Sequence, residues 1–171
     1  IDGVVITGGE PTIHKDLPKF CQEIKESNFL VKVDTNGTNP KMIKELIDKA
    51  LVDYVAMDVK APFTEEKYSQ ASGANITSLL AKIEETVQRL LEGRVEYEFR
   101  TTLVPTLHKV SDVKDICEKI KRCKKYALQN FRADSETIDP SFQTLKPFSQ
   151  QEMAKFFRTA KNIVPNTILR K

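Results

Sequence analysis

Short apolar runs alternate along the chain with stretches of helical spacing. The runs are rich in β-branched residues and predict strands at residues 4–6, 30–34, 54–60, 95–104 and 126–131, with a further edge strand at 167–169. Apolar residues three and four apart predict helices at 16–27, 40–50, 77–92, 111–124 and 149–160, and one or two helical turns within 64–73. This order is typical of βα units in a parallel sheet or barrel, so we expect a single α/β domain over residues 1–171.

Capping residues stand at the predicted helix ends. Polar N-caps are Asp16, Asn39, Ser111 and Ser149, of which Asn39 is followed by a proline and Ser149 has a glutamate three residues later. Gly93 follows the helix at 77–92, where a left-handed residue commonly ends a helix. These signals support the helix boundaries that the apolar spacing predicts.

Composition excludes several classes of protein. The chain has 171 residues, of which 40% are hydrophobic and 30% are charged, as in ordinary globular domains. It has no apolar run long enough to cross a bilayer and no basic-then-apolar segment of the kind that directs secretion, so we expect a cytoplasmic protein without a membrane partner. The net charge of +3 is scattered, apart from a basic group at 119–125 that suits a helix end, so we expect no nucleic-acid partner.

The cysteines and histidines form no pattern typical of a metal site or a catalytic triad. Cys21, Cys117 and Cys123 are far apart or six residues apart, and each falls on the apolar stripe of a predicted helix. We therefore interpret them as buried thiols and expect no metal ligands in this chain. His14 and His108 lie in predicted turns, where a role in solvent or in ordering the loop is favoured over catalysis.

Hydrogen-bonding residues lie toward the carboxyl ends of the first five predicted strands. Their positions are Thr7, Gly8, Gly9, Glu10 and Thr12, then Asp34, Thr35 and Asn36, then Asp58 and Lys60, then Arg100, Thr101 and Thr102, and finally Gln129, Asn130 and Arg132. The carboxyl ends of parallel strands and the loops after them build the functional site in βα folds. We therefore predict one polar site at this rim of the sheet.

Asp58 and Lys60 indicate what the site binds. Two residues apart in a strand, they present a carboxylate and an ammonium to the same face, which would complement a zwitterionic amino acid. Taken alone, the pair is also compatible with a surface ion pair of small energetic value. The backbone of the Gly8-Gly9 turn offers further acceptors for a ligand ammonium, and Arg100 offers a planar fork for a carboxylate, which favours a bound amino acid or derivative.

Four segments together resemble the radical S-adenosylmethionine (SAM) superfamily, and more closely its anaerobic ribonucleoside-triphosphate reductase activating proteins, of the glycyl-radical-activating branch. The segments are Ile6-Thr7-Gly8-Gly9-Glu10-Pro11-Thr12, Val33-Asp34-Thr35-Asn36-Gly37, the run from Asp53 to Pro62 that contains Asp58-Val59-Lys60, and Tyr97-Glu98-Phe99-Arg100-Thr101-Thr102. The likeness covers residues 1–135 and fades beyond Pro140.

The resemblance implies a partial (β/α)6 TIM-like barrel that binds SAM beside a [4Fe-4S] cluster. Reductive cleavage of SAM would give a radical that abstracts hydrogen from a glycine of a partner reductase, with electrons from a flavodoxin or ferredoxin. By residue, it implies that Gly8, Gly9, Glu10 and Asp58 belong to the cofactor-binding set on the ammonium side, Lys60 and Arg100 to the carboxylate side, Asp34 and Thr35 to the same site or to a cation near it, and Gln129 to the adenosine.

The sequence departs from the family in one respect. The Cys-x3-Cys-x2-Cys loop that ligates the family's cluster is absent, so we expect a chain that lacks the first βα unit and does not assemble the cluster by itself. Two alternatives stay open. One is a radical SAM enzyme acting on a small molecule, similar to 7-carboxy-7-deazaguanine synthase, and the other is a noncatalytic domain that binds a ligand or docks a partner.

Overall fold

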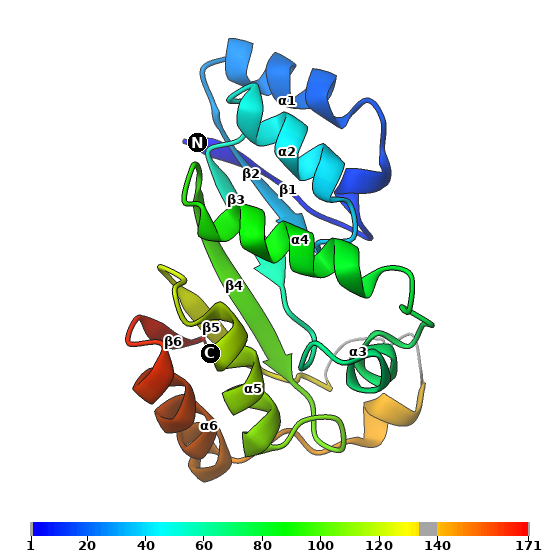
Figure 1. The fold of residues 1–171 in the computed structure, drawn as a ribbon, viewed down its shortest axis with the longest axis vertical. Helices are drawn as coiled ribbons and strands as arrows, with labels where there is room; N and C mark the ends of the chain where they lie inside the picture. The colour runs from blue at the N-terminus through cyan, green and yellow to red at the C-terminus, as the bar shows by residue number, and fades with distance from the viewer. Residues whose placement is uncertain (1, 134–139, 171) are drawn as a thin grey trace. The chain divides into compact units, whose positions relative to one another are not determined.

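The computed structural model describes residues 2–133 and 140–170, which form an α/β fold (Figure 1). The strands are β1 (Gly3–Ile6), β2 (Leu30–Thr35), β3 (Tyr54–Asp58), β4 (Glu96–Leu103), β5 (Tyr126–Asn130) and β6 (Thr167–Arg170). The helices are α1 (Leu17–Glu26), α2 (Pro40–Asp48), α3 (Glu65–Ser72), α4 (Leu80–Leu91), α5 (Val110–Ile120) and α6 (Gln150–Ile163), with short 3-10 turns η1 (Pro11–Ile13) and η2 (Pro140–Thr144).

The strands form one open sheet in the order β1-β2-β3-β4-β5-β6. Strand β2 pairs in parallel with β1 and with β3, and β5 pairs in parallel with β6. Sequential strand order with parallel pairing is what repeated βα units produce, and it confirms the predicted fold class. Contacts divide the chain into two compact units: the first runs to Val59 and includes Ile76–Phe99, and the second comprises Lys60–Asn75 and the chain from Arg100 onward.

In the first unit, the register of the strands separates two faces of the sheet. Val31 and Val33 are fully buried, whereas Lys32 and Asp34 between them keep partial exposure. Because side chains alternate along a strand, the buried pair faces the apolar stripes of the helices and the charged pair faces the other way. Helix α1 packs on β2, and α2 packs beside α4, as Figure 1 also shows.

An ion pair joins α1 to the start of β3 in the same unit. Lys25 Nζ lies 2.7 Å from Asp53 Oδ1, and the Val31 N–H donates to Asp53 Oδ2 at 2.7 Å. Burial acts to raise the pKa of Asp53, but the Lys25 ammonium and the Val31 N–H outweigh it and hold that pKa below its usual range. The carboxylate is thus bound in its ionised form.

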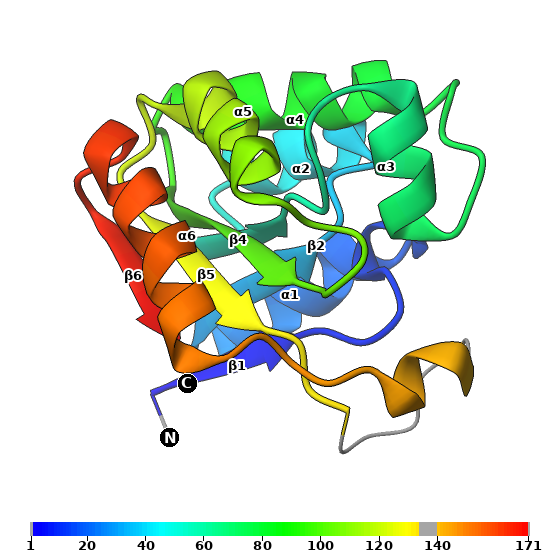
Figure 2. The same cartoon turned by 90° about the horizontal axis from the view of Figure 1, so that it is seen from below.

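In the second unit, α5 and α6 pack against each other, and α6 lies alongside β6 (Figure 2). The side chain of Tyr126 is fully buried, and its hydroxyl donates to Thr101 Oγ1 at 2.8 Å. Burial is the main reason that the pKa of Tyr126 is raised well above its ordinary value. The hydroxyl therefore stays protonated and serves as a structural donor in the core.

Most predicted boundaries agree with the structure to within a few residues. The Asn39 side chain accepts from the Met42 N–H, Ser149 and Glu152 form the predicted capping box, and Gly93 has φ 72°. Prediction fails at Ser111, because α5 begins at Val110 and its first turn is closed by the side chain of Asp112, which accepts from the Lys109 N–H at 2.7 Å. No helix within the described residues is long and apolar enough to span a membrane.

Candidate functional site

The Gly8-Gly9 turn leaves its main chain open to an approaching molecule. Gly8 has φ +116°, and no atom lies within 4 Å of the position that a Cβ would occupy on either glycine. Both residues are exposed. A turn without side chains therefore follows β1, as the sequence predicts for a backbone that a ligand can approach.

Glu10 ties this turn to the end of β2. Its Oε1 accepts from the Thr12 N–H at 3.2 Å, from the Thr12 hydroxyl at 2.5 Å and from the Thr35 hydroxyl at 2.8 Å. Its Oε2 accepts from the Asn36 N–H at 2.6 Å. The predicted cofactor-binding carboxylate thus has both oxygens engaged within the protein.

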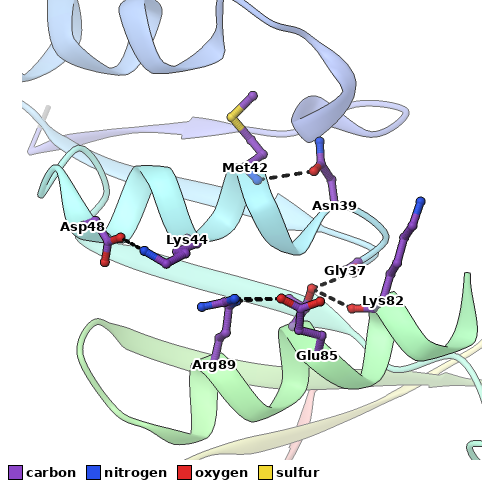
Figure 3. A network of polar contacts seen from close by, with 9 residues as sticks. Gly37, Asn39, Met42, Lys44, Asp48, Lys82, Glu85 and Arg89 are labelled. Carbon is purple, nitrogen blue, oxygen red and sulfur yellow. Dashed lines mark hydrogen bonds and ion pairs between the residues drawn. The ribbon is translucent and has the colours of Figure 1, made fainter.

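A second set of bonds continues from Thr35 into the turn at Gly37. Thr35 is buried, and its hydroxyl oxygen also accepts from the Gly37 N–H at 3.0 Å. The Gly37 carbonyl accepts from the hydroxyl of Thr86 on α4 at 2.7 Å, within the network of Figure 3. The Asn39 amide donates to the Thr12 carbonyl at 2.6 Å, so the start of α2 is bonded back to η1.

An open pocket of about 240 Å³ lies beside the Gly8-Gly9 turn. Its lining includes both glycines, Glu10, His14 directly after η1, and Phe20 on α1. His14 is exposed, in agreement with a histidine in solvent, and Phe20 is half exposed. The pocket provides a mixed polar and apolar wall next to the open main chain.

Asp34 and Asp58 lie on the opposite face of the strands from Thr35. Asp34 pairs in register with Ala56, and Asp58 follows two residues later on β3, so both project from the same face. Lys32 Nζ lies 3.2 Å from Asp34 Oδ1 and also sits 6.0 Å from the centre of the Tyr54 ring. The Asp34 carboxylate is therefore held beside an ammonium that also lies over an aromatic ring.

In the second unit, two side chains fix the main chain of Lys60. His108 Nε2 lies 2.8 Å from the Lys60 carbonyl oxygen, and the Lys60 N–H donates to the Tyr68 hydroxyl at 3.3 Å. The Val104 N–H donates to His108 Nδ1 at 3.0 Å, which leaves Nε2 to donate to the Lys60 carbonyl. His108 is buried and orders the loop, while Lys60 itself is exposed.

The other predicted residues of this unit lie on β4 and β5. Arg100 is half-buried within β4, and Gln129 is half-buried near the end of β5, in register with Arg170. The next residue along, Asn130, is bonded both ways to the main chain of Phe148, accepting at 3.2 Å and donating at 2.7 Å. Asn130 therefore fixes the loop before α6.

Residues 1–120, which are most of the chain, match the family model of the Radical SAM superfamily. The chain belongs to the radical SAM superfamily. It is 36% identical over 170 residues to a Methanocaldococcus jannaschii protein named as a glycyl-radical enzyme activating enzyme, covering 99% of this chain and 70% of that protein. A Methanococcus vannielii protein named as a GTP 3',8-cyclase is 29% identical over 119 residues, covering 68% of this chain and 39% of that one.

The fold of a solved structure agrees with this membership. A domain of pyruvate-formate lyase-activating enzyme from Bacteroides vulgatus superposes with a TM-score of 0.78, covering 99% of both chains at 14% sequence identity. At that identity the likeness concerns the fold alone. The likeness agrees with an open parallel sheet of the kind found in the partial TIM-like barrel of radical SAM proteins.

The described residues of this radical SAM chain do not fit an iron–sulfur cluster. Cys21, Cys117 and Cys123 are buried free thiols, and burial raises their pKa values to about 11, 12 and 11. Within residues 2–133 and 140–170, no three His, Cys, Asp or Glu side chains gather as a metal site. The thiols are protonated core residues, as their positions on apolar stripes predict.

Three residues that shape the site were not singled out from the sequence for the contacts they make. Thr86 is a polar residue within the apolar stripe of α4. A hydroxyl buried on that stripe needs a hydrogen-bond partner, and this position in the sequence could have indicated one. No sequence pattern marks the contacts of Tyr68 or Lys32. The Tyr68 hydroxyl accepts from the main-chain N–H of Lys60, and Lys32 pairs with Asp34 on the same strand.

Proposed function

We propose that this chain is the SAM-binding part of a radical SAM activating enzyme that produces a glycyl radical on an anaerobic ribonucleotide reductase. The observation that carries the proposal is the 36% identity to the M. jannaschii activating-enzyme relative over 99% of this chain. The likeness extends beyond residue 120, where the superfamily match ends. It therefore favours the activating branch over the superfamily in general.

In this proposal, the residues at the strand ends bind the amino-acid end of SAM. Their roles are main-chain acceptors at Gly8 and Gly9 and a carboxylate at Asp58 for the ammonium, cations at Lys60 and Arg100 for the carboxylate, and an amide at Gln129 near the adenosine. The open Gly8-Gly9 turn supports the first of these roles, because a ligand can reach its main chain without meeting a side chain. Ionic hydrogen bonds of this kind are about twice as strong as neutral ones.

Asp34 and Thr35 have different surroundings and are proposed for different tasks. Asp34 shares a strand face with Asp58, and its carboxylate, held by the Lys32 ammonium, is proposed to line the same site. Thr35 faces the core and holds the turns. Bound SAM supplies the radical that abstracts hydrogen from the partner's glycine, and a flavodoxin or ferredoxin is the proposed electron donor.

A small-molecule reaction is the second candidate. The M. vannielii relative named as a GTP 3',8-cyclase supports it, at 29% identity over 68% of this chain. The two candidates share the SAM site and differ in what the radical attacks.

Turnover with two substrates separates these candidates. The full-length protein, reconstituted without oxygen with iron and sulfide and given SAM and a reductant, is mixed with the anaerobic reductase of its own organism or with GTP. We expect a glycyl-radical signal in electron paramagnetic resonance with the reductase, and 5′-deoxyadenosine formation that depends on it. 5′-Deoxyadenosine that depends on GTP and no glycyl signal would instead establish the second candidate.

A further inference from the structure

The Glu10 carboxylate lies at the centre of the hydrogen bonds that join the turns after β1 and β2. Four donors converge on it: the N–H and hydroxyl of Thr12, the hydroxyl of Thr35 and the N–H of Asn36. Three of these donors bond Oε1 and the fourth bonds Oε2, out of about four acceptor positions that an ionised carboxylate offers. A ligand ammonium would therefore compete at Glu10 with donors that the protein itself supplies to both oxygens.

We propose that Glu10 is a positioning residue, which holds the open Gly8-Gly9 turn against the end of β2 and does not contact the ligand. The proposal rests on the function given above, because it assigns the turn to SAM. Glu10 directly follows Gly9, so bonds on its carboxylate limit the motion of the glycine main chain. The two glycines themselves have no side chains to restrict them.

Thr35 connects the turn after β1 to the turn after β2. We call this set of hydrogen bonds, from Glu10 through Thr35 to Gly37, the lock. Thr35 donates to Glu10 at 2.8 Å and accepts from the Gly37 N–H at 3.0 Å, while the Gly37 carbonyl is held by Thr86. The turn after β1 is therefore connected through one buried hydroxyl to the turn after β2 and to α4. Interactions preorganised in this way lower the ordering cost of binding.

The alternative is that Glu10 binds the ligand ammonium directly through its charge. Both ideas predict weaker binding when Glu10 is changed, but only positioning predicts the same loss when Thr35 is changed. Thr35 cannot supply a charge, and its side chain is buried away from Asp34 and Asp58. Coupling between positions 10 and 35 is therefore the discriminating quantity.

The test measures SAM affinity by equilibrium dialysis of the full-length, cluster-reconstituted protein. Glu10→Gln and Thr35→Val should each raise the Kd about tenfold, and the double variant should also raise it about tenfold, because both changes open the same lock. Thr35→Ser keeps the hydroxyl and should restore affinity to within about twofold of wild type. The matched control is Glu23→Gln on α1, an exposed carboxylate paired with Lys19, which should leave the Kd unchanged.

Amide hydrogen exchange without ligand provides the second readout. In Glu10→Gln, the N–H of Asn36 should exchange about tenfold faster than in wild type, because the glutamine NH2 group replaces the oxygen that accepts from it. A Thr35→Val variant with wild-type affinity, or a double variant weakened by the product of the single effects, would overturn the positioning role. A wild-type protein that binds no SAM would refute the proposed function, whereas unchanged amide exchange in Glu10→Gln would refute the lock alone.

Discussion

The turns after β1 and β2 hold their main chain differently from the segment after β3. In the first unit, side chains of the motif itself do the holding, since Glu10 and Thr35 bond the turns together. In the second unit, His108 and Tyr68 hold the main chain of Lys60 from other elements and leave its side chain exposed. Two predicted cofactor-binding residues therefore differ in their surroundings: both carboxylate oxygens of Glu10 accept hydrogen bonds from the protein, whereas the side chain of Lys60 is exposed.

The largest effect that would sharpen this comparison is expected at Gly37. Gly37 has φ +79°, and an added Cβ would lie 2.2 Å from Met57 Cε, so Gly37→Ala combines a left-handed backbone with a clash in the core. We expect the free energy of unfolding to fall by about 2–4 kcal/mol in urea titration. Gly73→Ala in the second unit is the matched control, because Gly73 has φ +68° but open space around it, and it should cost only about 1 kcal/mol. Equal losses would mean that Met57 moves aside freely.

Thr86 tests whether the hydroxyl or the bulk of a side chain supports the first unit's turns. Thr86→Val keeps the shape but leaves the Gly37 carbonyl without its 2.7 Å donor, so we expect a loss of about 1–3 kcal/mol in thermal or chemical unfolding. Thr86→Ser keeps the hydroxyl and should lose less. If serine is as destabilising as valine, packing of the methyl group rather than the bond supports the turn.

His108 carries the corresponding test in the second unit. His108→Ala removes the donor to the Lys60 carbonyl and the acceptor for the Val104 N–H, and should lower stability by about 1–2 kcal/mol. Faster exchange of the Val104 amide would report the same loss locally. His14 is exposed, so His14→Ala should leave stability almost unchanged. If both variants lose similar stability, the hydrogen bond from His108 to the Lys60 carbonyl is not the cause.

The smallest effect is expected from the ion pair that joins α1 to β3. Asp53 is about one-third exposed, so solvent screens it, and Asp53→Asn should cost about 1 kcal/mol or less near neutral pH. Its pKa is lower in the folded state, so this contribution is complete above the unfolded-state value of 3.8 and is lost as pH falls through the folded value. Urea titrations from pH 7 to pH 3 should show the variant and wild type converging only at the acidic end.

Local patterns in the sequence were sufficient for the elements of the fold. Helix caps such as Asn39 and Ser149 act on main-chain groups within three residues, so the sequence carries them directly. At α5 the same logic favoured Ser111, but the bond of the Asp112 side chain to the Lys109 N–H set the start of the helix two residues earlier than a serine N-cap requires. Boundary prediction fails where a neighbouring side chain, here that of Asp112, bonds an earlier N–H and so extends the helix past the expected cap.

The candidate site divides in the same way between sequence and tertiary structure. The order of the strand-end motifs was sufficient by itself to predict the family, the parallel sheet and the types of residue at the site. The reason is that parallel strands place their carboxyl ends together. Only the tertiary structure decided that Glu10 faces Thr35 and Asn36, residues 25 and 26 positions away, and that His108 meets Lys60 across 48 positions. A sequence pattern shows which groups can form hydrogen bonds, but folding brings distant donors to a carboxylate and so decides whether it remains free for a ligand.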